Sequence, residues 1–308
     1  MYRNLIVPLD GSSLAEHALA TAMALARRTG ARIELVRVHA PMQAEIAAEP
    51  DWSESLRQDE SEYLARTAAR AEEALGAEVG TALLDGPVVG AICTYAGRLS
   101  APLIIMSTHG RTGFSRLWLG SNADGIVRHT ACPVLMLRPA EATEGEPAPV
   151  LFRNVIVPLD GSPFAERVLP HAAELARATG AGLQLVRVVR PVNVPVFIPV
   201  PEYPMAYMPT PESVAEETKA ATDRAEAYMD GVVERVRRDA ADLAVQAEVR
   251  VAESAAGAIL EAAHTHDADA VALATHGRGL SRLVIGSVAD KVLRSGLRAM
   301  LVVRPGPA

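Results

Sequence analysis

Residues 4–12 read NLIVPLDGS, and residues 154–162 read NVIVPLDGS. In each copy an unbroken apolar run, such as Leu5–Leu9, leads directly to an aspartate, a glycine and a serine. A short continuous apolar run is typical of a parallel strand that is buried on both faces. Each aspartate is therefore expected just beyond the carboxyl end of a strand. The near-identity of the two copies indicates a duplicated unit.

A second pair of matching motifs lies near the end of each half. Residues 108–111 read THGR and are followed by Gly120 and Ser121, while residues 275–278 also read THGR and are followed by Gly286 and Ser287. The order of aspartate, glycine-rich turn and Gly-Ser pair thus occurs twice. We expect two domains with matching sites.

Strand and helix patterns alternate between these motifs, which predicts parallel sheets with right-handed crossovers. The first half has predicted strands at Leu5–Leu9, Arg32–His39, Val79–Leu84, Leu103–Met106 and Val134–Leu137, and predicted helices at Ser13–Arg28, Glu54–Leu75, Pro87–Leu99 and Ser121–His129. The second half repeats the pattern, with strands near Val155–Leu159, Leu183–Val189, Val245–Val251, Ala270–Ala274 and Ala299–Val303. The fold class is α/β, with two tandem Rossmann-like domains. Each is a five-stranded parallel sheet of order 3-2-1-4-5 with helices on both faces.

The predicted domain boundaries follow the composition of the chain. Residues 1–140 form the first domain, residues 141–151 the linker and residues 152–308 the second domain. Residues 190–211 interrupt the second domain and hold seven prolines, which exclude a regular helix or a central strand. Two interpretations stay open for this insertion. It is a stiff connector packed against a neighbouring domain or chain, or it is a lid or partner-docking loop.

Composition excludes several classes of protein. The 308 residues are 49% hydrophobic and carry a net charge of −7, which does not suit a nucleic-acid-binding surface. Cys93 and Cys132 are the only cysteines, and their spacing is not that of a metal site. The first apolar run is too short for a secretory signal, and no run is long enough to span a membrane. We expect a cytoplasmic protein that does not act on membranes.

The two motifs have complementary chemistry. With this strand order, Asp10 and the turn that follows Ser107 face each other across one crevice. Gly110 and Gly120 have no side chains that would shield their backbone amides from phosphate oxygens, and Ser121 is expected to cap the next helix. We expect these amides and the helix start to form a phosphate-binding site, called the phosphate seat below. Asp10 would repel phosphate, so it suits ribose hydroxyls or the amino group of a base. The alternative is that each Asp-Gly-Ser stretch is only a turn that caps a helix.

These motifs resemble those of the universal stress protein family in its tandem form, over nearly the whole chain. Nucleotide-binding members carry Gly-x2-Gly-x9-Gly-Ser/Thr and have an adenine nucleotide alpha hydrolase-like fold. The first half departs from this pattern with Ser107 at the first glycine, and the second half has Ala274 there and a loop one residue shorter. A well-formed first site and a doubtful second site are therefore predicted.

The resemblance implies that an adenine nucleotide contacts the same positions in both halves. In the first half these are Pro8, Leu9, Asp10, Val38, Met106, Ser107, Gly110, Arg111, Gly120, Ser121 and Asn122. In the second half they are Pro158, Leu159, Asp160, Val188, Leu273, Ala274, Gly277, Arg278, Gly286, Ser287 and Val288. For Arg111 and Arg278 a solvent-facing role is an equal alternative.

The predicted function is that of an ATP-binding, nucleotide-dependent regulator of the stress response, with Mg²⁺ as companion ion. AMP or another adenine nucleotide stays open as the ligand. No catalytic residue and no protein-ligated metal are predicted, because no water-activating base accompanies the phosphate seat and Lys219 and Lys291, the only lysines, lie in no phosphate-binding loop motif. The alternatives are a nucleotide-free scaffold that recruits a protein partner through the proline-rich loop, or a slow ATPase or nucleotide hydrolase on the same fold.

Assembly is predicted from the sheet edges. The two domains are expected to pair through their last strands, Val134–Leu137 and Leu301–Val303, because open edges favour pairing. The resemblance implies the same intrachain pseudo-dimer. A homodimer of two chains is a further alternative.

Overall fold

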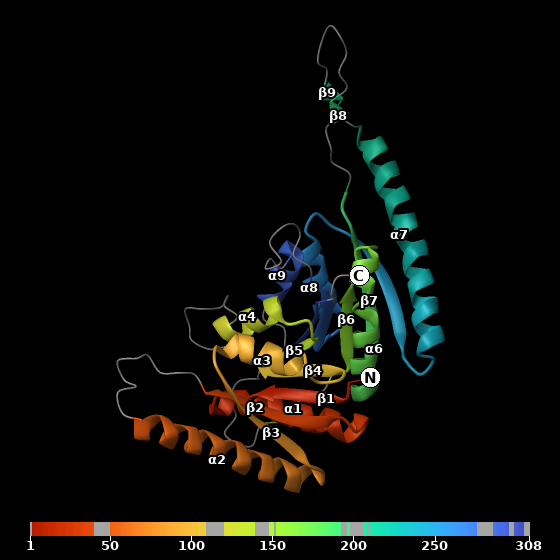
Figure 1. Ribbon diagram of the computed structural model, residues 1–308. Coiled ribbons are helices and arrows are strands. Elements are labelled where there is room, and N and C mark those ends of the chain that lie inside the picture. The colour runs from red at the N-terminus through yellow and green to blue at the C-terminus, as the bar shows by residue number, and fades with distance from the viewer. Residues whose placement is uncertain are drawn as a thin grey trace.

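The computed structural model describes residues 2–39, 50–108, 120–138, 148–150, 152–191, 196–197, 206–207, 210–275, 286–295 and 299–304. Strands and helices alternate through the first half (Figure 1). Its elements are β1 (Asn4–Pro8), α1 (Ser13–Thr29), β2 (Arg32–His39), α2 (Pro50–Leu75), β3 (Val79–Asp85), α3 (Val88–Ala96), β4 (Pro102–Ser107), α4 (Ser121–His129) and β5 (Val134–Leu137).

The second half repeats this order with two differences, a divided first helix and a short hairpin. Its elements are β6 (Asn154–Pro158), α5 (Pro163–Glu166), α6 (Leu169–Thr179), β7 (Gly182–Val189), β8 (Val196–Phe197), β9 (Ala206–Tyr207), α7 (Pro211–Asp239), β10 (Val245–Val251), α8 (Ala255–Thr265), β11 (Ala270–Ala274), α9 (Ser287–Leu293) and β12 (Ala299–Val303).

One ten-stranded sheet runs through both halves in the order β10-β7-β6-β11-β12-β5-β4-β1-β2-β3. Within each half the strands are parallel and follow the order 3-2-1-4-5, as predicted. The halves join where β12 pairs antiparallel with β5, with Leu301 opposite Leu135. The predicted pairing of the last strands is confirmed.

Helices cover both faces of the sheet and bury two layers of aliphatic side chains. Leu5 and Val7 of β1 belong to the layer under α1, α2, α6 and α7. Ile6 points the other way, into the layer under α3, α4, α8 and α9. This alternation follows from the two-residue period of a strand and explains why the strands read as unbroken apolar runs. Among the described helices, none is long and apolar enough to cross a bilayer.

The divided helix is a difference between the halves that the repeated pattern did not predict. In the first half α1 is continuous and ends at Gly30, which adopts φ 70°. In the second half the corresponding segment is α5 and α6, with Arg167 and Val168 between them. Pro170 lies in the first turn of α6. It has no N–H to donate to Glu166, and its ring clashes with that carbonyl, so one helix cannot run through this point.

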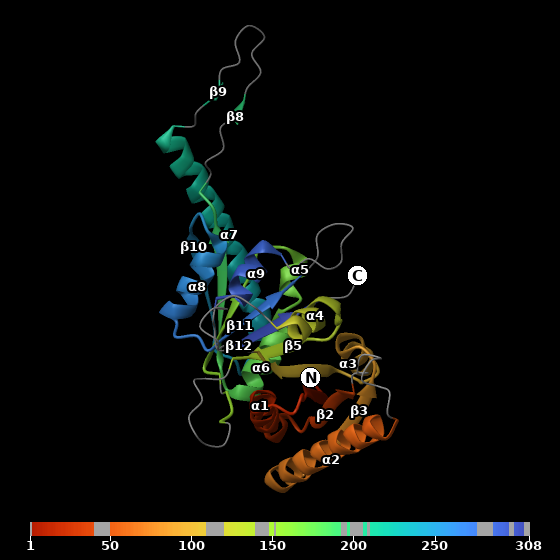
Figure 2. The same ribbon diagram turned by 90° about the vertical axis from the view of Figure 1, so that its left-hand side faces the viewer.

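Most of the proline-rich insertion lies outside the described residues. Within it, Val196–Phe197 and Ala206–Tyr207 pair as a small antiparallel hairpin, and Pro211 is the first residue of α7. In both views this hairpin lies beyond the N-terminal end of α7, away from the ten-stranded sheet (Figures 1 and 2). These two strands therefore do not pack on the neighbouring domain, whereas the connector interpretation expected the insertion to pack on a neighbouring domain or chain.

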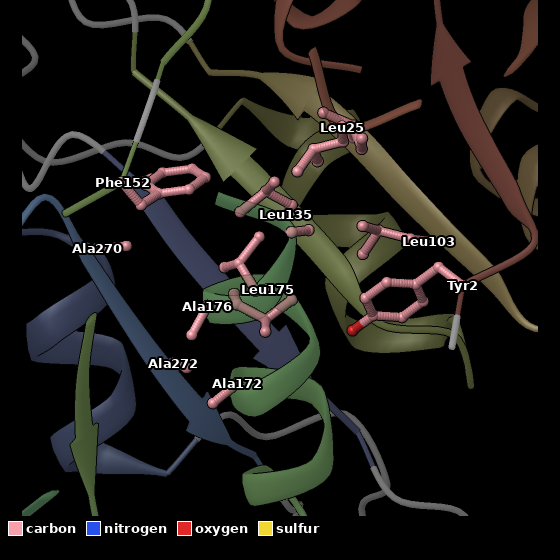
Figure 3. Packing of buried hydrophobic residues seen from close by; sticks show 14 of the residues in the cluster. Tyr2, Leu25, Leu103, Leu135, Phe152, Ala172, Leu175, Ala176, Ala270 and Ala272 are labelled. Carbon is pink, nitrogen blue, oxygen red and sulfur yellow. The ribbon is translucent and has the colours of Figure 1, made fainter. Parts of the chain in front are cut away.

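The junction between the halves is part of the hydrophobic core. Leu135 of β5 and Leu175 of α6 lie in one cluster with Phe152 and Ala272 (Figure 3). Tyr2, from the first half, stacks on His171 of α6, with a distance of 5.8 Å between ring centroids. The two halves are consequently packed as one body rather than joined only by the linker.

Candidate functional site

The two repeated aspartates adopt the same local structure at the carboxyl ends of β1 and β6. Asp10 Oδ1 accepts hydrogen bonds from the Ser12 amide at 2.9 Å and the Ser12 hydroxyl at 2.6 Å. Asp160 Oδ1 accepts the same two bonds from Ser162, at 2.9 and 2.5 Å. Each serine also caps the following helix, as Ser12 does by accepting from the Ala15 amide. The helix-capping turn of the alternative interpretation is therefore present in both halves.

An arginine lies against each of these turns. Gly11 and Gly161 adopt φ of +88° and +80°, and a Cβ on either would lie 2.8 or 2.5 Å from Nη1 of Arg37 or Arg187. Both the backbone conformation and the arginine therefore favour glycine. The strand-end motif thus places an acid beside a guanidinium that comes from the next strand.

A polar network of a tyrosine, a glutamate and a second arginine lies beside each of these arginines and is present in both halves. Arg37 lies 5.3 Å from the ring centre of Tyr63, whose hydroxyl donates to Glu16 at 3.0 Å. Arg70 also donates to Glu16, at 3.0 Å. The second half repeats these contacts with Arg187, Tyr228, Glu166 and Arg235. The motifs did not predict this network. Its detectable signal lies in two parts, because the spacing from the glutamate to the first arginine and the spacing from the tyrosine to the second arginine are the same in both halves.

The two networks differ at one charge. In the first half the buried Glu60 carboxylate pairs with Arg37 at 3.2 Å and with His39 at 2.7 Å. In the second half Ala225 occupies the position in sequence that corresponds to Glu60. Nε and Nη1 of Arg187 are buried and have no hydrogen-bond partner among the described residues.

The charge of Arg187 acts on the Asp160 carboxyl. Its burial raises its pKa, but the two hydrogen bonds from Ser162 and the charge of Arg187 outweigh burial, so the pKa of Asp160 lies below its usual value. Asp160 is therefore a carboxylate at neutral pH. It can accept hydrogen bonds from hydroxyl or amino groups and would repel a phosphate.

The opposite rim of each site is the start of a helix without a side-chain cap. Gly120 and Gly286 are the N-cap residues of α4 and α9, with φ, ψ of −54°, 149° and −57°, 148°. This corrects the expectation that Ser121 is the cap, because Ser121 is the first residue of α4. Glycine brings no side-chain acceptor, so the first amides of the helix stay available to an anion.

In the second half the two rims enclose a cavity of about 590 Å³. Every predicted second-half residue that the structure describes lines it, namely Pro158, Leu159, Asp160, Val188, Leu273, Ala274, Gly286, Ser287 and Val288. The other residues that line the cavity were not predicted from the motifs; they are Ala165, Val186, Arg190, Ala255, Ile259, Thr275, Ala289 and Val292. Val186 was detectable, because it lies two residues before Val188 on the same face of β7.

The first half brings its predicted residues together in the same topology. β1 and β4 are neighbours, and α4 starts at the same edge of the sheet. Ser107 Oγ is buried and has no hydrogen-bond partner among the described residues. Gly110, Arg111, Gly277 and Arg278 lie outside the described residues. The expectation that the first half has the better-formed nucleotide site therefore stays a prediction. The second site has an open cavity, although the loop between its motifs is one residue shorter.

Comparisons with known proteins agree on one family. A family model described as the universal stress protein family matches residues 1–138 and 151–304. A universal stress protein of Methanocaldococcus jannaschii is 32% identical over 143 residues, which cover 45% of this chain and 83% of the relative. One from Mycobacterium bovis is 27% identical over 256 residues, which cover 80% of this chain and 78% of the relative. A universal stress protein structure from Archaeoglobus fulgidus matches with a TM-score of 0.67 at 17% identity, covering 98% of both chains.

Proposed function

Because the chain belongs to the universal stress protein family, we propose that it binds an adenine nucleotide in each half and acts as a cytoplasmic, nucleotide-dependent regulator of the stress response. The observation that supports this most directly is the second-half cavity. It has a carboxylate on one rim and an uncapped helix start on the other. A ligand that suits both rims is anionic at one end and carries hydroxyl or amino groups at the other.

The cavity wall fits the remaining parts of a nucleotide. Val186, Val188 and Ile259 supply apolar surface for a planar base. Asp160 Oδ1 is held by Ser162, which fixes the carboxylate at the position where ribose hydroxyls would donate to it. The amides that follow Gly286 would receive the phosphates.

We propose ATP with Mg²⁺ as the bound form. The described residues contain no group of three or more histidine, cysteine, aspartate or glutamate side chains that could hold a metal. The ion would therefore be held mainly by phosphate oxygens and water, which is the usual coordination of Mg²⁺ beside a nucleotide. Binding of AMP would then need no metal.

The proposed role is that of a sensor rather than an enzyme that turns over rapidly. Among the described lining residues Asp160 is the only acid, and it belongs to the rim opposite the phosphate seat. A general base for hydrolysis must reach the attacking water beside the phosphates. We expect at most slow ATP hydrolysis, with a rate that does not collapse in Asp160→Asn.

Two measurements test nucleotide binding. Mass spectrometry of the small molecules released by denaturing freshly purified protein is expected to show an adenine nucleotide. Thermal unfolding with Mg²⁺ and ATP at a hundred times Kd is expected to show about 2.7 kcal/mol of added stability. No co-purified nucleotide and no shift at millimolar ATP would contradict the proposal.

A second candidate is a scaffold that recruits a protein partner through residues 190–211. It is favoured by the hairpin of β8 and β9, which lies beyond the end of α7 in both views (Figures 1 and 2). Deletion of residues 192–209 is then expected to abolish partner capture without changing the affinity for ATP. An unchanged set of partners would exclude this role.

A further inference from the structure

One of the residues that line the second-half cavity is a positively charged side chain that is not part of the nucleotide motifs. Arg190 directly follows β7 and lines the cavity. Its side chain is exposed, and no described residue forms an ion pair or hydrogen bond with it. An arginine that lines a concave site and has no partner among the described residues has donors available to a ligand.

The place of Arg190 in the sheet separates it from the phosphate seat. β7 lies on one side of β6, and β11, which leads to α9, lies on the other side. Asp160, at the end of β6, is therefore between the two. The cavity thus offers a cation on the base and ribose side as well as the helix start on the phosphate side.

Arg190 is not needed to balance the charge of Asp160. The guanidinium that acts on this carboxyl is that of Arg187, which lowers the pKa of Asp160 together with Ser162. Arg187 lies against the Gly161 turn. The two arginines therefore have different surroundings, and Arg190 is the one that lines the ligand cavity.

From this placement we infer that the second site prefers an adenine nucleotide with a second phosphate on the ribose 2′ or 3′ oxygen, bound by Arg190. The inference rests on the proposed function and specifies its ligand. A carboxylate at a ribose accepts a hydrogen bond from a free hydroxyl, whereas an arginine beside it accommodates a ribose phosphate. Here Asp160 takes the remaining hydroxyl, and Arg190 pairs with the phosphate through its planar fork of donors.

The preference is specific to the second half. The residue that corresponds to Arg190 in the first half is Ala40, which has no charge. The two sites of one chain are thereby expected to take different ligands, with a singly phosphorylated ribose in the first and a doubly phosphorylated ribose in the second.

Calorimetric titration of the full chain tests this inference with AMP, adenosine 2′,5′-bisphosphate and adenosine 3′,5′-bisphosphate at one ionic strength. The parent carries Gly120→Val, so that the second site is titrated. At least one bisphosphate is expected to bind roughly tenfold tighter than AMP, the effect of one charge-assisted pair. In Arg190→Gln this ratio is expected to fall to about one.

The matched control is Arg238→Gln, which removes an exposed arginine of α7 without a partner among the described residues and so changes the net charge equally. It is expected to keep the ratio. Equal affinities for AMP and both bisphosphates, or a ratio that survives Arg190→Gln, would overturn the inference and leave the proposed function standing. Failure of the parent and the wild type to bind any of the three nucleotides would also overturn the inference, and failure of both proteins to bind ATP with Mg²⁺ as well would overturn the proposed function.

Discussion

At the scale of single residues, the two sites differ in the partners of the arginine that lies beside each aspartate turn. Asp10 and Asp160 accept the same hydrogen bonds from their serines. Arg37, beside the first turn, shares its charge with Glu60, whereas the second half has no acid at that position. Burial raises the pKa of Asp160, and the hydrogen bonds from Ser162 together with the charge of Arg187 lower it by more.

This arrangement predicts how stability depends on pH at Asp160. Its pKa is lower in the folded protein than the usual 3.8, so the folded state favours the carboxylate. The stabilisation is present above the unfolded pKa and is lost as the pH falls through the folded one. The difference in melting temperature between wild type and Asp160→Asn is expected to stay constant above about pH 5 and to shrink below about pH 4. A difference that disappears near pH 6 would contradict this.

The N-cap glycines permit a test of each site without disturbing the fold. A Cβ on Gly120 or Gly286 would meet no described atom within 4 Å, so Val is expected to fit in the free protein. Its branches would occupy the space through which phosphate reaches the helix amides. Gly120→Val and Gly286→Val are each expected to remove one nucleotide per chain in equilibrium dialysis, with a modest loss of stability because valine is a weaker N-cap residue than glycine.

Gly231→Val is the control for these variants, because Gly231 of α7 also has open space around its Cβ position. It is expected to retain both nucleotides. Loss of both nucleotides from either single variant would mean that the two sites are not independent.

At the scale of secondary-structure elements, the sequence predicted the strands and their order but not every helix. The unbroken apolar runs and their alternation with helical patterns predicted the parallel strands, and the order 3-2-1-4-5 was expected from the doubly wound fold class; the sheet confirms both. The interruption between α5 and α6 required attention to Pro170 within an otherwise helical pattern. The network of Glu16, Arg37 and Tyr63 was not predicted, because its members come from separate elements and meet only after α1 and α2 pack on the sheet.

The same limit applies to the candidate site. The motif residues were predictable because the carboxyl ends of neighbouring strands meet at one edge of the sheet. Ala255 and Ile259 of α8 line the cavity as a result of helix packing, which no local pattern specifies. Arg190 follows the predicted β7 strand, yet nothing in its neighbours distinguishes a lining arginine from a solvated one.

The duplicated network predicts equal energetic effects in the two halves. Tyr63→Phe and Tyr228→Phe each remove a hydroxyl that donates to a glutamate, at 3.0 and 2.8 Å, and keep the ring beside the arginine. Each is expected to lower the free energy of unfolding by about 1.5–3 kcal/mol, the usual net contribution of a hydrogen bond to a charged group. Urea denaturation measures both. A loss confined to one half would show that the two networks are not equivalent.

At the scale of the whole molecule, the junction between the halves contains a titratable contact. The Tyr2 hydroxyl hydrogen-bonds to Nδ1 of His171 at 3.0 Å. Burial lowers the pKa of His171 below its usual 6.5, so the folded state favours the neutral ring. Its contribution to stability is complete above about pH 6.5 and is lost as the pH falls toward the lower folded pKa.

Acidification from pH 7.5 to 5.5 is therefore expected to lower the melting temperature less in His171→Gln than in the wild type. The control is His264→Gln, which removes an exposed histidine of α8 and is expected to leave the pH dependence unchanged. Identical pH profiles for His171→Gln and the wild type would show that the junction does not respond to pH.

The fused sheet predicts that the two halves unfold together. Leu135 is fully buried, lies opposite Leu301 across the antiparallel junction and belongs to a core cluster that contains residues of both halves (Figure 3). Leu135→Ala leaves a cavity in this shared core and is expected to reduce the free energy of unfolding by about 2–5 kcal/mol. Because the core is continuous, calorimetry is expected to show one transition moved to lower temperature.

The control is Val251→Ala, at a residue that is 48% exposed, which is expected to change the free energy of unfolding by less than about 0.5 kcal/mol. Two separate transitions, with only one moved by Leu135→Ala, would show that the halves fold as independent units despite their common sheet.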